Sequence, residues 1–255
     1  LMMSGTKSTE GEDFELETLP RLVKQKFPHI NLEVMKLPDD QYYTSLKTKL
    51  ATGEAPDFML AQPKMAGANS VFGLAKAGYL LDISDLSALE KAGPGVADFT
   101  YEGKTYVVPN GVDFLATYYN KDMFEANDIQ IPTNWDEFLE ACETLKNAGI
   151  TPIVMGDKDS YVMQFGLYQI AANRVYPENP KFDEQLGEGT TKFTDGQWEE
   201  IISMYNELYE KGYMVENSLG LGAAQSIQKF IDGEAAMIFD GSFNATAVSA
   251  QGAVD

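Results

Sequence analysis

The stretch IDGEAAMIFDGSF, residues 231–243, joins a charged turn to a short apolar run and then to a second turn. Residues 235–239 are small or apolar, as in a buried strand. The run stops abruptly at Asp240-Gly241-Ser242, and an aromatic residue, Phe243, follows at once. The stretch therefore predicts a buried strand that ends by presenting an aromatic ring on a glycine turn.

A short apolar run, a turn and an amphipathic helix follow one another in this order along the rest of the chain. Thr133 and Thr194 each precede such a helix and have the spacing of a capping box. Glu102-Gly103 lies between two strand-like runs and predicts a hairpin. Alternating strands and helices predict α/β units with mostly parallel sheets. We expect strands near 1–3, 30–34, 58–61, 112–119, 151–155 and 235–239, and helices near 18–27, 39–52, 64–77, 133–149, 159–173, 194–212 and 223–232.

The composition excludes several classes of function. The 255 residues are 44% hydrophobic, enough for a real core, and their formal net charge is −20 at pH 7. This charge repels phosphates, so we expect no binding to nucleic acid. One histidine and one cysteine cannot supply a four-ligand zinc site or an internal disulfide. We expect His29 in a solvated turn, and Cys142, Trp135 and Trp198 in core positions.

No catalytic motif stands out in the chain. The phosphate-binding P-loop motif is absent, and GLGAAQ (220–225) has only part of a dinucleotide-binding fingerprint. DKDSY (157–161) lacks ligands that a calcium loop needs. What remains is a set of polar strand ends, some of which bring an aromatic ring, and this mixture suits a neutral polyhydroxylated ligand. These strand ends are residues 4–8, 61–64, 112–114, 156–161 and 240–243.

Four segments resemble the extracellular solute-binding proteins of bacterial ABC importers, of the maltose-binding type. They are LATGEAPDFML (50–60), YVVPNGVDFLATYYNKDMF (106–124), IPTNWDEFLEACETLKNAGITPI (131–153) and FIDGEAAMIFDGSF (230–243). The resemblance implies a two-lobe periplasmic-binding-protein-like fold (type II), in which each lobe is an α/β sheet flanked by helices. It divides the chain into a first lobe, 1–111, and a second lobe, 112–255. Because relatives continue beyond this point, we expect the first lobe to be incomplete, with its sheet edge covered by a partner copy, a swapped segment or further chain.

The resemblance also implies a ligand site between the lobes. Phe243 would provide an aromatic platform for a sugar ring, and Tyr161 a second aromatic contact. Asp113 matches a carboxylate of the site, and Asp240 belongs to the same strand-end turn as Phe243. Gln164 is our addition, one helical turn beyond Tyr161. The remaining candidates are Thr6 and Lys7 in the first polar turn and Gln62 and Lys64 in the second strand-end loop.

The resemblance implies that the protein binds a carbohydrate, an oligosaccharide in our interpretation, and delivers it to the membrane permease of an ABC transporter. It implies no catalytic residue, no metal and no cofactor. It places the protein at the extracellular face of the cytoplasmic membrane as a lipoprotein, or in the periplasm. Two alternatives stay open. The acidic charge would suit a cationic ligand such as a polyamine, and the 39 acidic residues leave room for a carbohydrate-active hydrolase.

Overall fold

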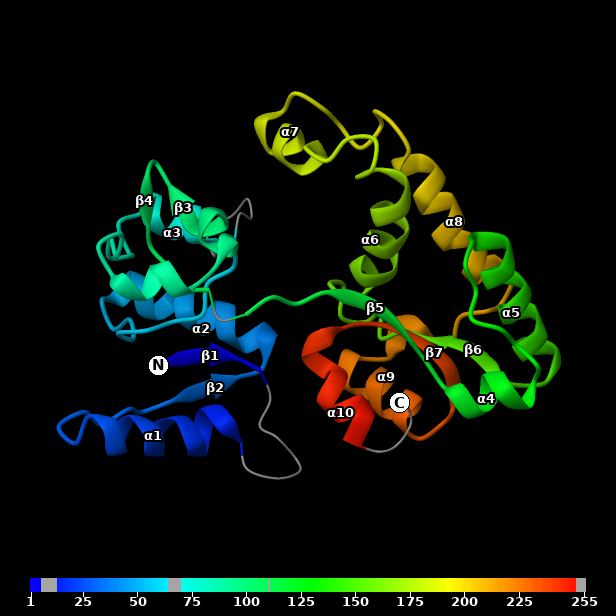
Figure 1. Cartoon of the computed structure of the whole chain (residues 1–255), viewed down its shortest axis with the longest axis horizontal. Coiled ribbons are helices and arrows are strands. Elements are labelled where there is room, and N and C mark those ends of the chain that lie inside the picture. Colours follow the sequence, from blue (N-terminus) through cyan, green and yellow to red (C-terminus); the bar gives the residue numbers. More distant parts are fainter. Residues whose placement is uncertain (6–12, 64–69, 110, 251–255) are drawn as a thin grey trace. The chain divides into compact units, whose positions relative to one another are not determined.

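The computed structural model describes residues 1–5, 13–63, 70–109 and 111–250. The chain divides into two compact units, Leu1–Val112 and Asp113–Asp255 (Figure 1). Among the described residues, no helix combines the length and the apolar character that a membrane crossing would need.

The first unit is built around a small parallel sheet of β1 (Met2–Ser4) and β2 (Met35–Leu37). Met2 lies at its centre, because it pairs with Met35 and also forms a bridge to Met59. Tyr42 packs beneath it and donates a hydrogen bond from its hydroxyl to the carbonyl of Leu60 (2.6 Å). The other elements of this unit are the π-helical turn η1 (Phe14–Thr18), α1 (Leu19–Lys26), α2 (Asp39–Thr52), α3 (Val71–Lys76), the 3-10 turns η2 (Ser87–Lys91) and η3 (Pro94–Phe99), β3 (Thr100–Tyr101) and β4 (Lys104–Thr105).

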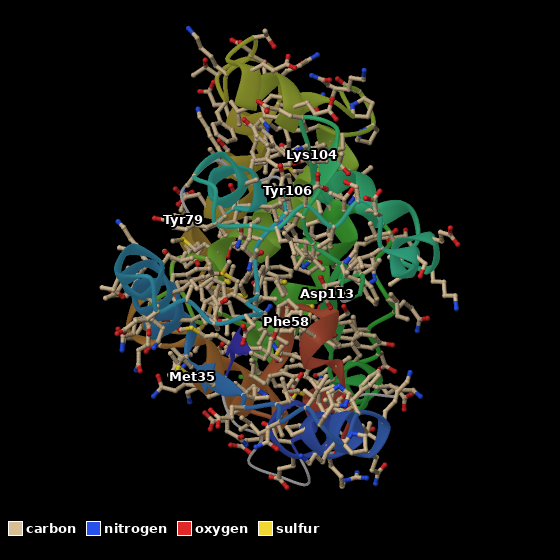
Figure 2. All side chains as sticks on the ribbon, turned by 90° about the vertical axis from the view of Figure 1, so that its left-hand side faces the viewer. Met35, Phe58, Tyr79, Lys104, Tyr106 and Asp113 are labelled. Atoms are coloured by element: carbon tan, nitrogen blue, oxygen red, sulfur yellow. The ribbon has the colours of Figure 1, made fainter. Side chains whose placement is uncertain are left out.

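Several expectations for the first unit are confirmed. The helix predicted over 39–52 is α2, and Gly53 ends it in the left-handed conformation. Glu102 and Gly103 both have positive φ and join β3 to β4 in an antiparallel hairpin. Lys104 is the first residue of β4, and Tyr106 follows the hairpin (Figure 2). His29 is exposed in a turn, as expected.

Two strand predictions in this unit are wrong. The alternating residues 30–34 form no strand, and the paired segment is β2, Met35–Leu37, which comes directly after them. Among the described residues, 30–34 have no partner strand, because β1 is only three residues long and its register pairs it with residues 35–37. The run 58–61 is likewise reduced to the single bridge at Met59, and Phe58 is exposed.

The second unit contains a three-stranded sheet in the order β5-β7-β6. The central strand is β7 (Ala235–Gly241), and all seven of its residues are buried. It runs parallel to β6 (Thr151–Val154) and antiparallel to β5 (Leu115–Tyr119), so the sheet is mixed. The remaining elements are α4 (Lys121–Ala126), α5 (Trp135–Asn147), α6 (Met163–Arg174), α7 (Phe182–Glu188), α8 (Trp198–Glu210), the 3-10 turns η4 (Ser218–Gly220) and η5 (Ser242–Asn244), α9 (Ala223–Ile231) and α10 (Ala245–Ala250).

Neither predicted capping box has its threonine as the cap in the structure. Asn134, not Thr133, caps α5, and its Oδ1 accepts the hydrogen bond of the Glu137 amide (3.0 Å). Asn is a better N-cap than Thr, which agrees with the choice of Asn134 over its neighbour Thr133. Thr194 does not cap α8, which begins only at Trp198.

The core assignments of the second unit are confirmed. Cys142 and Trp198 are buried, and Trp135 is half-buried and stacked on Phe138.

Candidate ligand-binding site

Strand direction gathers the polar candidates of the second unit at one edge of its sheet. β6 and β7 are parallel, so their carboxyl ends lie at the same edge. β5 runs the other way, and its first residue, Leu115, pairs with Gly241 at the end of β7. Asp113 therefore lies at this edge because it comes just before β5, whereas the sequence analysis counted it among the polar strand ends and inside a strand near 112–119. Figure 2 labels its position.

Ser242 connects the two strands and orients Asp113. Its amide donates to the Phe114 carbonyl (2.8 Å), and the Phe114 amide donates to its Oγ (3.1 Å). The Ser242 hydroxyl donates in turn to Oδ1 of Asp113 (2.9 Å). Asp113 is exposed, so this hydrogen bond presents a solvent-facing carboxylate in a defined orientation.

Asp240 lies at the same edge but is buried. Its Oδ1 accepts from the Gly241 amide (2.7 Å), and both carboxylate oxygens accept from Nδ2 of Asn244 (3.0 Å each). Burial is the main influence on this carboxyl and raises its pKa above the ordinary value. The side chain of Asp240 thus holds the η5 turn, which carries Phe243.

Phe243 is 54% exposed, and its ring lies over Gly241. A Cβ at Gly241 would lie only 2.0 Å from Cε1 of the ring, so the glycine makes room for it. The ring also packs against Phe165, with 5.9 Å between centroids. Tyr161, 42% exposed, makes an edge-to-face contact with the same Phe165 (5.9 Å). Two exposed rings therefore share one buried phenyl support.

The helix α6 supplies that support and is fixed to the sheet. Gln169 accepts a hydrogen bond from Oγ1 of Thr117 (2.8 Å) and donates one to the Ala116 carbonyl (3.2 Å), and both partners belong to β5. Gln164 is exposed on α6, one turn beyond Tyr161. We define the strand-end site as Asp113, Phe114, Tyr161, Gln164, Asp240, Ser242 and Phe243.

Phe114 and Ser242 are the members of this site that sequence reasoning missed. Phe114 is a large exposed aromatic directly after Asp113. The sequence pattern did not mark Phe114 as a site residue, because residues 114–119 alternate only weakly between apolar and polar side chains. Ser242 lies within the quoted DGSF turn, but its bond to Asp113 joins residues 129 positions apart.

Of the candidate site residues in the first unit, the structure describes only Gln62. Gln62 is half-buried and donates a hydrogen bond from Nε2 to the Tyr43 hydroxyl (2.7 Å). Thr6, Lys7 and Lys64 lie outside the described residues. Within the described part of the chain, no group of three or more histidine, cysteine or acidic side chains is arranged to hold a metal ion.

Comparisons with known proteins match this architecture. A multiple sugar-binding protein of Streptococcus mutans is 24% identical over 92% of this chain and 56% of its own length. A maltodextrin-binding protein of Bacillus subtilis is 26% identical over 88% of this chain and 52% of its own length. The chain therefore spans little more than half the length of these relatives.

Among solved structures, a chitin oligosaccharide binding protein superimposes with a TM-score of 0.78 at 25% identity, over 91% of this chain and 58% of that one. The likeness confirms the predicted α/β fold class, the type II periplasmic-binding-protein-like fold. A family model described as bacterial extracellular solute-binding protein matches residues 15–254. The chain belongs to the family of bacterial extracellular solute-binding proteins.

Proposed function

We propose that this protein binds a neutral oligosaccharide at the strand-end site and delivers it unchanged to the permease of an ABC importer. The observation that carries the proposal is the pair of exposed rings, Phe243 and Tyr161, on the shared Phe165. The sugar specificities in the names of the relatives, multiple sugars, maltodextrin and chitin oligosaccharide, support the same ligand class.

The site has the two kinds of group that sugar recognition requires. Exposed aromatic faces pack against the apolar faces of sugar rings. The oriented Asp113 carboxylate can accept charge-assisted hydrogen bonds from sugar hydroxyls, which are about twice as strong as neutral ones. A micromolar affinity corresponds to about 8 kcal/mol, which such contacts can supply together.

In this proposal the protein is a capture protein and not an enzyme. The two units correspond to the two lobes of the family fold, and the sugar favours the conformation in which it makes more contacts. The protein would act at the extracellular face of the membrane, held by a lipid anchor, or in the periplasm. Family membership supports the extracellular location.

A thermal-shift screen of the full-length protein tests the ligand class. The panel consists of malto-, xylo- and chito-oligosaccharides, with putrescine and spermidine as cationic competitors. We expect a stabilising shift with at least one oligosaccharide series and none with the polyamines. A shift with polyamines alone would overturn the proposal, and so would lasting release of shorter sugars from a bound oligosaccharide.

A matched pair of variants tests the location. Phe243→Ala should weaken sugar binding several-fold, since a stacked ring contributes about 1 kcal/mol. Ile202→Ala removes a side chain of almost equal exposure, 55%, from α8 of the same unit and should leave the affinity unchanged. Equal effects of the two substitutions would refute the assignment of Phe243.

A further inference from the structure

The exposed face of α6 continues the strand-end site along the second unit. Tyr161, just before the helix, and Gln164 and Tyr168, within it, recur at the spacing of one helical face. All three are exposed, Tyr168 to 38%. Tyr161 and Tyr168 are seven positions apart, which corresponds to about 10 Å at the rise of a helix and is longer than one sugar ring.

The opposite face of α6 is packed closely enough to hold this exposed face in place. Gly166 meets α8 and β7 so tightly that a Cβ there would lie 2.4 Å from the Tyr205 ring and 2.8 Å from the Phe239 ring. The Gln169 hydrogen bonds tie the next turn to β5. In Figure 1 the helix extends from the sheet toward α7, with α8 alongside.

A second pair of exposed rings lies at the far end of this face. Tyr168 packs edge-on against the buried Trp198 (6.0 Å between centroids, 87° between planes). Phe193, which precedes α8 and is 51% exposed, also packs edge-on against Trp198 (5.1 Å between centroids, 88° between planes). Two exposed aromatics thus rest on one buried indole, just as Tyr161 and Phe243 rest on Phe165.

Polar groups accompany these rings. The carboxylate of Asp183 accepts hydrogen bonds from the Tyr176 hydroxyl (3.0 and 3.1 Å). Phe182, which precedes Asp183 in the sequence, packs against Trp198 (5.7 Å between centroids) and Phe193 (5.9 Å), so this carboxylate belongs to the same cluster of rings. Burial, and after it the charge of Asp183, raises the pKa of the Tyr168 hydroxyl. The indole N–H of Trp198 is buried and has no hydrogen-bond partner among the described residues. Exposed rings beside a carboxylate repeat the composition of the strand-end site.

We infer that Tyr168 and Phe193 form a second sugar-contacting subsite, so that the ligand is a linear oligosaccharide longer than a disaccharide. The inference rests on the proposed function, because it extends the same bound sugar along α6. Gln164 lies between the two pairs of rings and can bond the hydroxyls of the intervening sugar unit. In this arrangement a disaccharide occupies the rings of Phe243 and Tyr161, and further sugar units contact Tyr168 and Phe193.

Calorimetric titration with matched short and long ligands tests this subsite. The probes are the disaccharide and the hexasaccharide of the malto-, xylo- and chito-oligosaccharide series, and the proteins are the wild type, Tyr168→Ala, Phe193→Ala and the ring-keeping control Tyr168→Phe. We expect the wild type to bind a hexasaccharide more tightly than its disaccharide. Tyr168→Ala and Phe193→Ala should each weaken the hexasaccharide by roughly five- to tenfold and leave the disaccharide unchanged. Tyr168→Phe should behave as the wild type.

The outcomes separate the inference from the proposed function. If Phe243→Ala weakens both ligands while Tyr168→Ala changes neither, or changes both equally, the second subsite is refuted and the function stands. If no sugar of the panel binds, the proposed function itself fails. As a readout independent of affinity, the variant Trp135→Phe retains Trp198 as its single tryptophan. Its fluorescence should change with the hexasaccharide and not with the disaccharide, and an equal response to both would contradict the inference.

Discussion

The substitution Gly241→Ala tests whether binding depends on the position of the Phe243 ring, because it displaces the ring without removing it. The backbone of Gly241 is extended, with φ −97° and ψ 158°, so alanine can adopt it without strain. The added Cβ, however, would lie 2.0, 2.4 and 2.6 Å from Cε1, Cζ and Cδ1 of Phe243, far inside normal contact distance. The ring must therefore rotate away from β7 and lose its contact with Phe165.

The expected cost falls on binding and not on folding. Phe243 is about half exposed, so its ring can swing into solvent, and the backbone pairing of Gly241 with Leu115 needs no change. Losing a stacked ring costs about 1 kcal/mol, or roughly a fivefold increase in Kd. The melting temperature should stay within a few degrees of the wild type.

A double-mutant cycle measured by calorimetry tests this reasoning. Gly241→Ala and Phe243→Ala should each weaken sugar binding by a similar factor. Once the ring is absent, Gly241→Ala should have no further effect, so the two substitutions are not additive. Additive losses, or a Gly241→Ala variant that binds as tightly as the wild type, would refute the positioning of the ring by this glycine.

Three further predictions concern the same unit. Ser242→Ala removes the donor that orients Asp113, and calorimetry should show a few-fold weaker sugar binding with a nearly unchanged melting temperature. Burial raises the folded-state pKa of Asp240, so the folded state binds more protons than the unfolded state between the unfolded-state pKa, about 4, and the higher folded-state pKa, and this residue's contribution to stability is lost as pH rises through that window. Denaturant unfolding from pH 4 upward should therefore show that Asp240→Asn gains stability relative to the wild type as pH increases. Burial raises the pKa of Cys142 to about 12, so a thiol reagent should label the native protein only at the rate of unfolding.

Local signals in the sequence were sufficient for several elements of both units. The apolar run 235–239 is the core of β7, and the strand continues through Gly241. The hairpin at Glu102-Gly103 was predictable because Gly103 readily adopts positive φ between two strand-like runs, whereas the positive φ of Glu102 is uncommon for a non-glycine residue. The exposed Phe243 after a glycine turn was also predictable, since the ring needs the space that Gly241 leaves.

Features that depend on distant partners could not be predicted from local pattern. The antiparallel direction of β5 follows from its pairing with β7, more than 100 residues away, and it brings the beginning of β5, next to Asp113, to the edge at which β7 ends. The shared support of Tyr161 and Phe243 on Phe165 joins two parts of the chain in the same way. The periodicity of residues 30–34 was misleading, because only residues 35–37 have a partner strand.

A crystal structure of the full-length protein with its tightest-binding oligosaccharide tests the central claim most directly. We predict a sugar ring in contact with the Phe243 ring, within about 4 Å, and a sugar hydroxyl bonded to Asp113. Tyr161 should contact the same ligand. A sugar bound elsewhere, with Phe243, Tyr161 and Asp113 all free of contact, would contradict the account.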